Sequence, residues 1–117
     1  MAGRSRSAVY ARRRRRRMAA SDHDLTDAQW DALQAEWRGC AYCEQPDDAL
    51  QRDCILPISR GGRYTLTNVV PACRSCNASK CNAEVTQWMR RKKLDEKRFL
   101  VRQFQISRVV AEAPEAG

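Results

Sequence analysis

The chain has 117 residues, of which 43% are hydrophobic and 7% aromatic, and its formal net charge is +8. This length fits one small domain with tails, and no apolar run is long enough to span a membrane. A core of this size usually needs a further staple, such as a structural metal ion.

The excess positive charge lies near the N-terminus. Residues 1–20 hold eight arginines and no acid, whereas the fourteen other Lys and Arg residues balance the fourteen Asp and Glu residues. Because like charges repel, we expect residues 1–22 to be a disordered tail that binds DNA or another polyanion through phosphate contacts. An organelle transit peptide and a true start at Met18 are alternative interpretations.

The first predicted element is a helix over residues 26–38. Thr26 and Gln29 have the spacing of a capping box. Three apolar residues recur at helical spacing and predict a face turned to the core: Trp30, Leu33 and Trp37. The only histidine, His23, precedes this helix, and we expect it to be solvated.

Two Cys-x-x-Cys pairs follow, Cys40 with Cys43 and Cys73 with Cys76, separated by twenty-nine residues. Each pair presents two thiolates from one tight turn, and two such turns can complete a tetrahedral Zn²⁺ site. Two disulfides or four unrelated cysteines are the alternatives, but nothing in the sequence indicates export to an oxidising compartment. The pattern therefore predicts a structural zinc site.

Between the cysteine pairs, the composition predicts a loop at residues 44–50 and a strand at 51–58. A turn at Gly61 and Gly62 leads to a second strand or extended loop at 64–70. This order of elements, followed by a helix, indicates a small α+β fold.

After the second cysteine pair, residues 74–91 predict one helix, closed by the basic cluster 90–93. This cluster either complements the helix dipole or meets a nucleic acid backbone. Asp95 is expected to cap a last helix whose apolar face is Phe99, Leu100 and Phe104. We expect residues 111–117 to fray, which leaves a domain over residues 23–110.

The stretch between and around the cysteine pairs resembles the HNH endonuclease family. Asp53 is followed by Pro57, the double glycine, Asn68 and Cys76-Asn77-x-x-Lys80, in the order of the family's D-H-x-x-P-x-S-x-G-G, N-x-x-P and C-x-x-C-N-x-x-K motifs. The resemblance covers residues 40–80, about a third of the chain. It implies a ββα-metal (His-Me finger) core stapled by a four-cysteine zinc site, with flanking helices.

The resemblance also implies site residues. Asp53 and Asn77 would hold one divalent cation, and their oxygen atoms suit Mg²⁺ or Mn²⁺. Asn68 would orient the general base. The basic residues expected to meet phosphates are Lys80, Arg60 and Arg63.

One position departs from the family's pattern. Cys54 stands where the family has its first histidine, which removes a proton from water. A thiol titrates near pH ~8.5 and a neighbouring carboxylate raises its pKa further, so Cys54 cannot copy an imidazole. Either another base serves, or the protein cuts slowly, or it only binds DNA. Cys81 either lies apart from Cys54 or forms a thiol site with it.

By resemblance, we expect a metal-dependent DNA endonuclease that works in the cytoplasm of a bacterium or a phage-infected cell. A catalytically silent DNA-binding zinc module that retains the HNH fold is the main alternative, and a zinc scaffold for protein contacts is a third. The retained Asp53, Asn68, Asn77 and Lys80 favour catalysis, whereas Cys54 favours the silent module.

Overall fold

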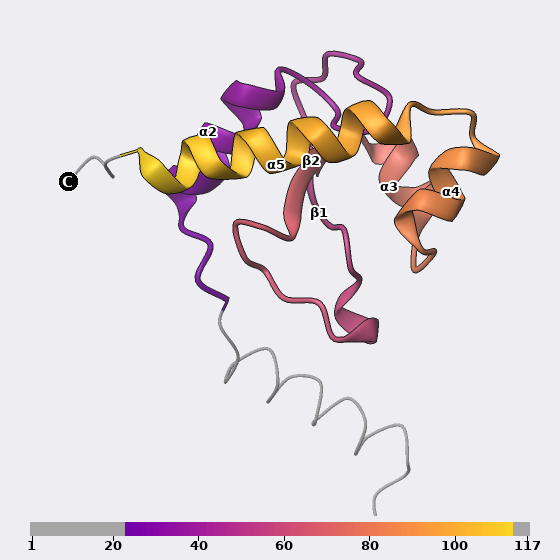
Figure 1. The fold of residues 1–117 in the computed structure, drawn as a ribbon, viewed down its shortest axis with the longest axis horizontal. Coiled ribbons are helices and arrows are strands. Elements are labelled where there is room, and N and C mark those ends of the chain that lie inside the picture. Colours follow the sequence, from indigo (N-terminus) through magenta and orange to yellow (C-terminus); the bar gives the residue numbers. More distant parts are fainter. Residues whose placement is uncertain (1–22, 114–117) are drawn as a thin grey trace, which may run out of the picture.

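The structure, a computed structural model, describes residues 23–113. The predicted tail at residues 1–22 lies outside this range, as do residues 114–117. Within residues 23–113, a two-stranded antiparallel sheet and a short 3₁₀ helix are combined with four α-helices (Figure 1). The predicted α+β fold is therefore confirmed.

Helix α2 (Asp27–Trp37) begins at the predicted capping box. The Thr26 hydroxyl accepts the Gln29 N–H at 3.0 Å, and the Gln29 side chain accepts the Thr26 N–H at 3.0 Å. Leu33 and Trp37 are buried, as the apolar spacing predicts. Trp30 is only partly buried, and the Arg52 guanidinium lies 5.3 Å from its ring centroid.

The two strands are shorter than predicted. Strand β1 (Gln51–Cys54) pairs with β2 (Val69–Ala72), so that Asp53 lies opposite Val70. The predicted strand 51–58 ends early because the chain bends after Cys54 and enters the 3₁₀ helix η1 (Ile58–Arg60). Pro57, which lacks an N–H group, precedes this turn, and a proline cannot donate to a strand ladder.

The predicted helix over residues 74–91 is wrong in one respect, because two helices occupy it. Helix α3 (Arg74–Lys80) ends at Cys81, whose φ is 48°. Helix α4 (Val85–Arg91) then starts afresh, since the Glu84 carboxylate accepts the N–H groups of Thr86 and Gln87. The positive φ of Cys81 ends α3, and the Glu84 cap stabilises the start of α4.

Helix α5 (Glu96–Glu112) is capped by Asp95, as predicted, through the Arg98 N–H at 3.0 Å. Its predicted apolar face is correct only for Phe99. Leu100 and Phe104 are 46% and 60% exposed, and the core-facing residues are Phe99, Ile106, Ser107 and Val110. Apolar residues occur on several sides of this helix, so spacing alone did not identify the buried side. Helix α5 packs across α2 (Figure 1).

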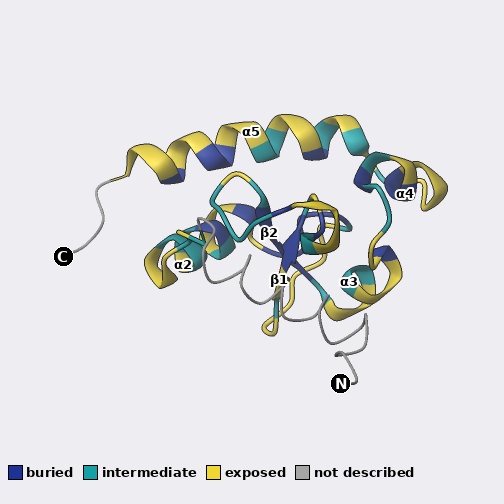
Figure 2. Cartoon of the chain, turned by 90° about the horizontal axis from the view of Figure 1, so that it is seen from below, coloured by how far each residue is buried: buried dark blue, intermediate teal, exposed yellow. Residues whose placement is uncertain are grey.

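The centre of the core is built around Tyr42, which lies between the two cysteines of the first pair. Its ring packs edge-on against Trp88 with centroids 5.2 Å apart, and it stacks on Phe99 at 5.1 Å. Tyr42 belongs to the same buried cluster as residues of β2, α4 and α5, and Figure 2 colours the buried parts of these elements dark blue. The packing carries the Tyr42 hydroxyl to the buried side of β1.

Candidate functional site

The four cysteines of the two Cys-x-x-Cys pairs come together. The sulfur atoms of Cys40, Cys43, Cys73 and Cys76 all lie within 4.8 Å of one another. Cys43 Sγ and Cys73 Sγ are 3.8 Å apart, which matches the spacing of about 3.8 Å between thiolates that hold zinc at about 2.3 Å in a tetrahedron. The cluster is therefore positioned to bind a metal ion such as zinc.

The raised pKa of a cysteine in this cluster is also consistent with a site that binds a cation. Burial, followed by the nearby Cys40 charge and contacts to the other sulfurs, raises the pKa of Cys76 well above the ordinary thiol value. Four neighbouring thiolates repel one another, and Zn²⁺ offsets this repulsion because each coordinating thiol is deprotonated outright. The turns that hold the sulfurs are themselves fixed, since the Cys73 sulfur accepts the Cys76 N–H at the start of α3.

Beside the cysteine cluster, Asp53 on β1 is buried and anchored through one oxygen. Its Oδ2 atom accepts a hydrogen bond of 2.5 Å from the Tyr42 hydroxyl and lies 3.2 Å from the Lys80 ammonium. Burial and the Asp53 charge raise the pKa of Tyr42 well above its usual value, so the phenol remains a donor. Within residues 23–113, both polar contacts of this carboxylate go to Oδ2, which leaves Oδ1 uncommitted.

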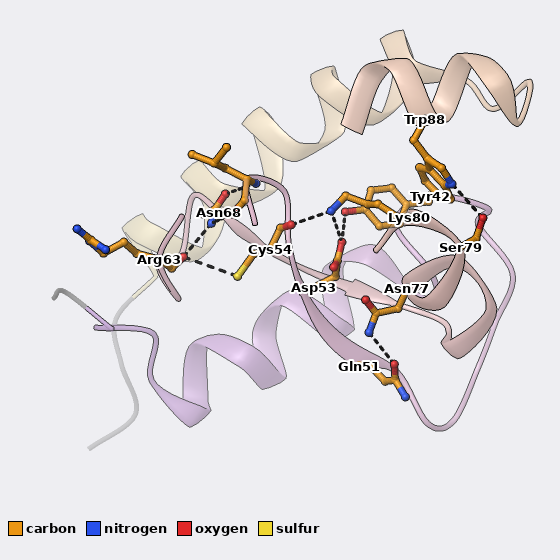
Figure 3. Close-up of polar contacts among 11 residues, drawn as sticks. Tyr42, Gln51, Asp53, Cys54, Arg63, Asn68, Asn77, Ser79, Lys80 and Trp88 are labelled. Carbon is orange, nitrogen blue, oxygen red and sulfur yellow. Dashed lines mark hydrogen bonds and ion pairs between the residues drawn. The ribbon is translucent and has the colours of Figure 1, made fainter. Parts of the chain in front are cut away.

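Lys80 does not lie where we expected it. Its side chain is completely buried, and its Nζ atom donates to the Cys54 carbonyl oxygen at 2.9 Å besides pairing with Asp53. The expectation of a phosphate contact is therefore wrong, because the ammonium faces the interior (Figure 3). Arg60 is exposed and Arg63 is partly exposed, so both remain able to reach a phosphate.

Asn77 on α3 shows the same arrangement as Asp53. Its Nδ2 atom donates to the Gln51 side-chain oxygen at 2.7 Å. Its Oδ1 atom makes no hydrogen bond within residues 23–113 and points toward the Asp53 carboxylate (Figure 3). An open groove of about 420 Å³ adjoins this side chain, lined by Gln51, Arg74, Asn77, Ala78, Cys81 and Asn82. Asn77 is therefore reachable from solvent.

Cys54 is buried at the end of β1, and its sulfur lies 4.0 Å from the Arg63 carbonyl oxygen. Burial, and then the neighbouring Asp53 charge, raise the pKa of Cys54 to about 11, although Lys80 opposes the shift. At neutral pH the side chain is therefore a thiol, which is a poor acceptor for a proton from water. The sequence predicted this direction of shift from Asp53.

Asn68 holds the loop that follows β1. Its side chain accepts the Leu56 N–H at 2.8 Å and donates to the carbonyl oxygens of Leu56 and Arg63 at 3.0 and 2.9 Å. Gly62 is required beside it, since a Cβ atom there would lie 1.7 Å from the Leu56 oxygen. Asn68 and Cys54 thus contact the same carbonyl group, that of Arg63.

The two remaining cysteines are not joined. Cys54 and Cys81 are both free, and Cys54 is buried whereas Cys81 is exposed on the groove beside Asn77. His23 was expected to be solvated, but it is partly buried and its Nδ1 atom accepts the Tyr64 N–H at 3.2 Å. This contact ties the start of the described chain to the loop that Asn68 holds.

Two residues of this site were not predicted, Tyr42 and Gln51. A signal for Gln51 existed, because it lies two residues before Asp53, and alternate residues of a strand share one face. Tyr42 gave no such signal, since its contact with Asp53 depends on how the cysteine turn packs against β1.

Comparison with known proteins supports one family. Residues 40–94 match the family model described as HNH endonuclease. No curated protein and no solved structure gave a match. None of the helices in residues 23–113 is long and apolar enough to cross a membrane. The family match indicates a nuclease or nucleic-acid-binding role, and the cysteine cluster and the two-stranded sheet agree with this similarity to the HNH endonuclease family over residues 40–94.

Proposed function

We propose that this chain is a metal-dependent DNA endonuclease of the HNH type. The observation that carries the proposal is the pair of uncommitted oxygen atoms, Asp53 Oδ1 and Asn77 Oδ1, on neighbouring elements, with Asn77 lining an open groove. Carboxylate and amide oxygens are ligands that Mg²⁺ and Mn²⁺ accept. When bound, such a cation stabilises the negative charge that develops on a phosphoryl oxygen during hydrolysis.

The protein's own groups would hold the substrate around that cation. Arg60 and Arg63 lie on the loop that Asn68 fixes, and both can meet backbone phosphates flanking the bond that is cut. Arg74 lines the groove and is exposed, which makes it a further candidate for such a contact. DNA is thus proposed as the partner, held mainly through its phosphates. The cytoplasm remains our prediction for the place of action, from the resemblance alone.

Cys54 makes slow cleavage the expected outcome. A positioned general base typically contributes about 10²–10⁴-fold to such a reaction, and a buried thiol with a pKa of about 11 does not supply it at neutral pH. The same observation favours the second candidate, a nucleic-acid-binding module of the same fold that does not cut.

A plasmid-nicking assay with Mg²⁺ or Mn²⁺ separates the two candidates. We expect slow nicking by the native chain and a loss of about a hundredfold or more in Asp53→Ala and Asn77→Ala, since the stabilisation supplied by the cation is worth several kcal/mol. Asp48→Ala is the matched control, because this exposed acid does not line the groove. The zinc content and thermal unfolding of each variant are measured beside nicking, because Asp53→Ala leaves the buried Lys80 charge unpaired. DNA binding without nicking under either metal would establish the silent module instead.

A further inference from the structure

Each of the two proposed cation ligands has one atom anchored and one atom left over. The Asp53 carboxylate is held through Oδ2 by Tyr42 and Lys80. The Asn77 amide is held through Nδ2 by Gln51. A cation would be bound by the two oxygen atoms that remain, Asp53 Oδ1 and Asn77 Oδ1. The hydrogen bonds to Asp53 Oδ2 and Asn77 Nδ2 therefore determine which atoms face the cation.

An amide side chain needs such an anchor more than a carboxylate does. The two oxygens of a carboxylate are equivalent ligands, whereas rotating the Asn77 amide by half a turn would offer its nitrogen, which is a donor and cannot bind a cation. In the structure Gln51 Oε1 accepts the Asn77 Nδ2–H at 2.7 Å, and this orientation of the Asn77 amide leaves its Oδ1 free. Gln51 thus favours the productive orientation.

Gln51 is well placed for this role. It lies on β1 two residues before Asp53, so both side chains are on the same side of the strand. It also lines the groove beside Asn77 and is exposed, so it contributes little to the core. Figure 3 shows Gln51, Asn77 and Asp53 in succession along this side of β1.

We propose that Gln51 is a positioning residue that presents the Asn77 amide oxygen to the divalent cation shared with Asp53. The proposal rests on the proposed function, because it assumes that Asp53 and Asn77 are the ligands. Removing a hydrogen bond that orients a metal ligand commonly lowers the affinity for the metal by about 10–100-fold.

The test is Mn²⁺ binding to the zinc-loaded full chain, measured by calorimetry, which does not depend on cleavage. Gln51→Met removes the acceptor at similar size, and we expect its Mn²⁺ affinity to fall by about tenfold or more. Gln51→Glu retains an acceptor for the Asn77 N–H group and should bind Mn²⁺ at least as well as the native chain. Asn82→Asp adds the same charge to the groove and controls for simple attraction.

A double-mutant cycle tests whether Gln51 changes the Mn²⁺ affinity through Asn77. If Gln51 acts through Asn77, adding Gln51→Met to Asn77→Ala should cause no further loss of affinity, whereas a general disturbance of the groove would add to it. Native affinity in Gln51→Met while Asn77→Ala weakens binding, or additive losses in the double variant, overturns the proposal. If Asn77→Ala leaves Mn²⁺ binding unchanged, the proposed cation site itself is wrong and the role of Gln51 falls with it.

Discussion

The Lys80 ammonium and the Asp53 carboxylate form an ion pair inside the protein, with Nζ 3.2 Å from Oδ2 and both side chains buried. Lys80 also donates to the Cys54 carbonyl oxygen on the same strand. The pair therefore ties α3 to β1 beside the proposed cation ligands Asp53 and Asn77. Burying a lone charge is costly, so each partner offsets the cost of burying the other.

The first prediction concerns this pair. Removing one partner of a buried ion pair leaves an uncompensated charge, which costs about 3–5 kcal/mol. We expect Lys80→Met to lower the free energy of unfolding by about that amount in urea denaturation of the zinc-loaded protein. Lys97→Met, on the exposed side of α5, should change it little. If Lys80→Met is as stable as the control, the pair does not hold α3 against β1.

The second prediction concerns the cysteine cluster. Zinc binding supplies folding free energy in small domains of this kind, so strong chelation should unfold the protein. Native mass spectrometry should find one zinc per chain, and Cys73→Ala should lose both zinc and soluble expression. Cys81→Ala is the control, because Cys81 is exposed and lies outside the four-sulfur cluster. A chelated, metal-free chain with unchanged thermal unfolding would contradict this role.

The third prediction follows from the pKa of Cys54, raised to about 11 by burial and by Asp53. Only the thiolate reacts with iodoacetamide, so a raised pKa moves the onset of reaction above the range of about 8.5 that an ordinary thiol shows. In the zinc-loaded protein, the exposed Cys81 should be alkylated before the buried Cys54, which should react only as the pH approaches 11. Mass spectrometry of each peptide measures both rates.

The raised pKa of Cys54 also determines how the free energy of unfolding changes with pH. The folded state holds the Cys54 proton more tightly than the unfolded chain, so its contribution to stability is present below about pH 8.5 and is lost as the pH rises toward 11. Cys54→Ser should remove that alkaline dependence. Equal alkylation of Cys54 and Cys81 at neutral pH would show that Cys54 is not held as a buried thiol.

Much of the core around the four-cysteine cluster could be predicted because its signals are local. The capping box of Thr26 and Gln29 and the two Cys-x-x-Cys turns each depend on residues within four positions of one another. The break between α3 and α4 was missed because Cys81 adopts a φ of 48° where no glycine or proline marks a break. A strong new cap at Glu84 was the one local sign of it.

The role of Lys80 could not be predicted for a different reason. Lysine is rarely buried unless it is paired, and its partners Asp53 and Cys54 are more than twenty residues away in the sequence. The pairing needs α3 to lie against β1, which only the tertiary structure supplies. The buried face of α5 could not be predicted for the same reason. Packing against α2, and not the spacing of apolar residues in the sequence, determines which side of α5 is buried.

The last prediction separates a nuclease that lacks a good base from a silent module. Cys54 Sγ lies 4.0 Å from the Arg63 carbonyl oxygen, which Asn68 already holds by a hydrogen bond of 2.9 Å. A histidine at this position could donate one ring N–H to that carbonyl, which would leave the other ring nitrogen as a proton acceptor. We expect Cys54→His to raise the nicking rate by about 10²–10⁴-fold, the contribution typical of a positioned base.

The controls for Cys54→His follow from the site itself. Cys54→Ser fills similar space without a base and should give no gain, and the gain from histidine should vanish when Asn77→Ala is added. Because imidazole is larger than a thiol and Cys54 is only 8% exposed, overpacking could cost about 1–3 kcal/mol. Zinc content and thermal unfolding of the variant are therefore measured beside its activity. A folded, zinc-loaded Cys54→His chain that binds DNA and nicks no faster than the native protein would contradict the nuclease proposal, and the silent nucleic-acid-binding module would then be the better description.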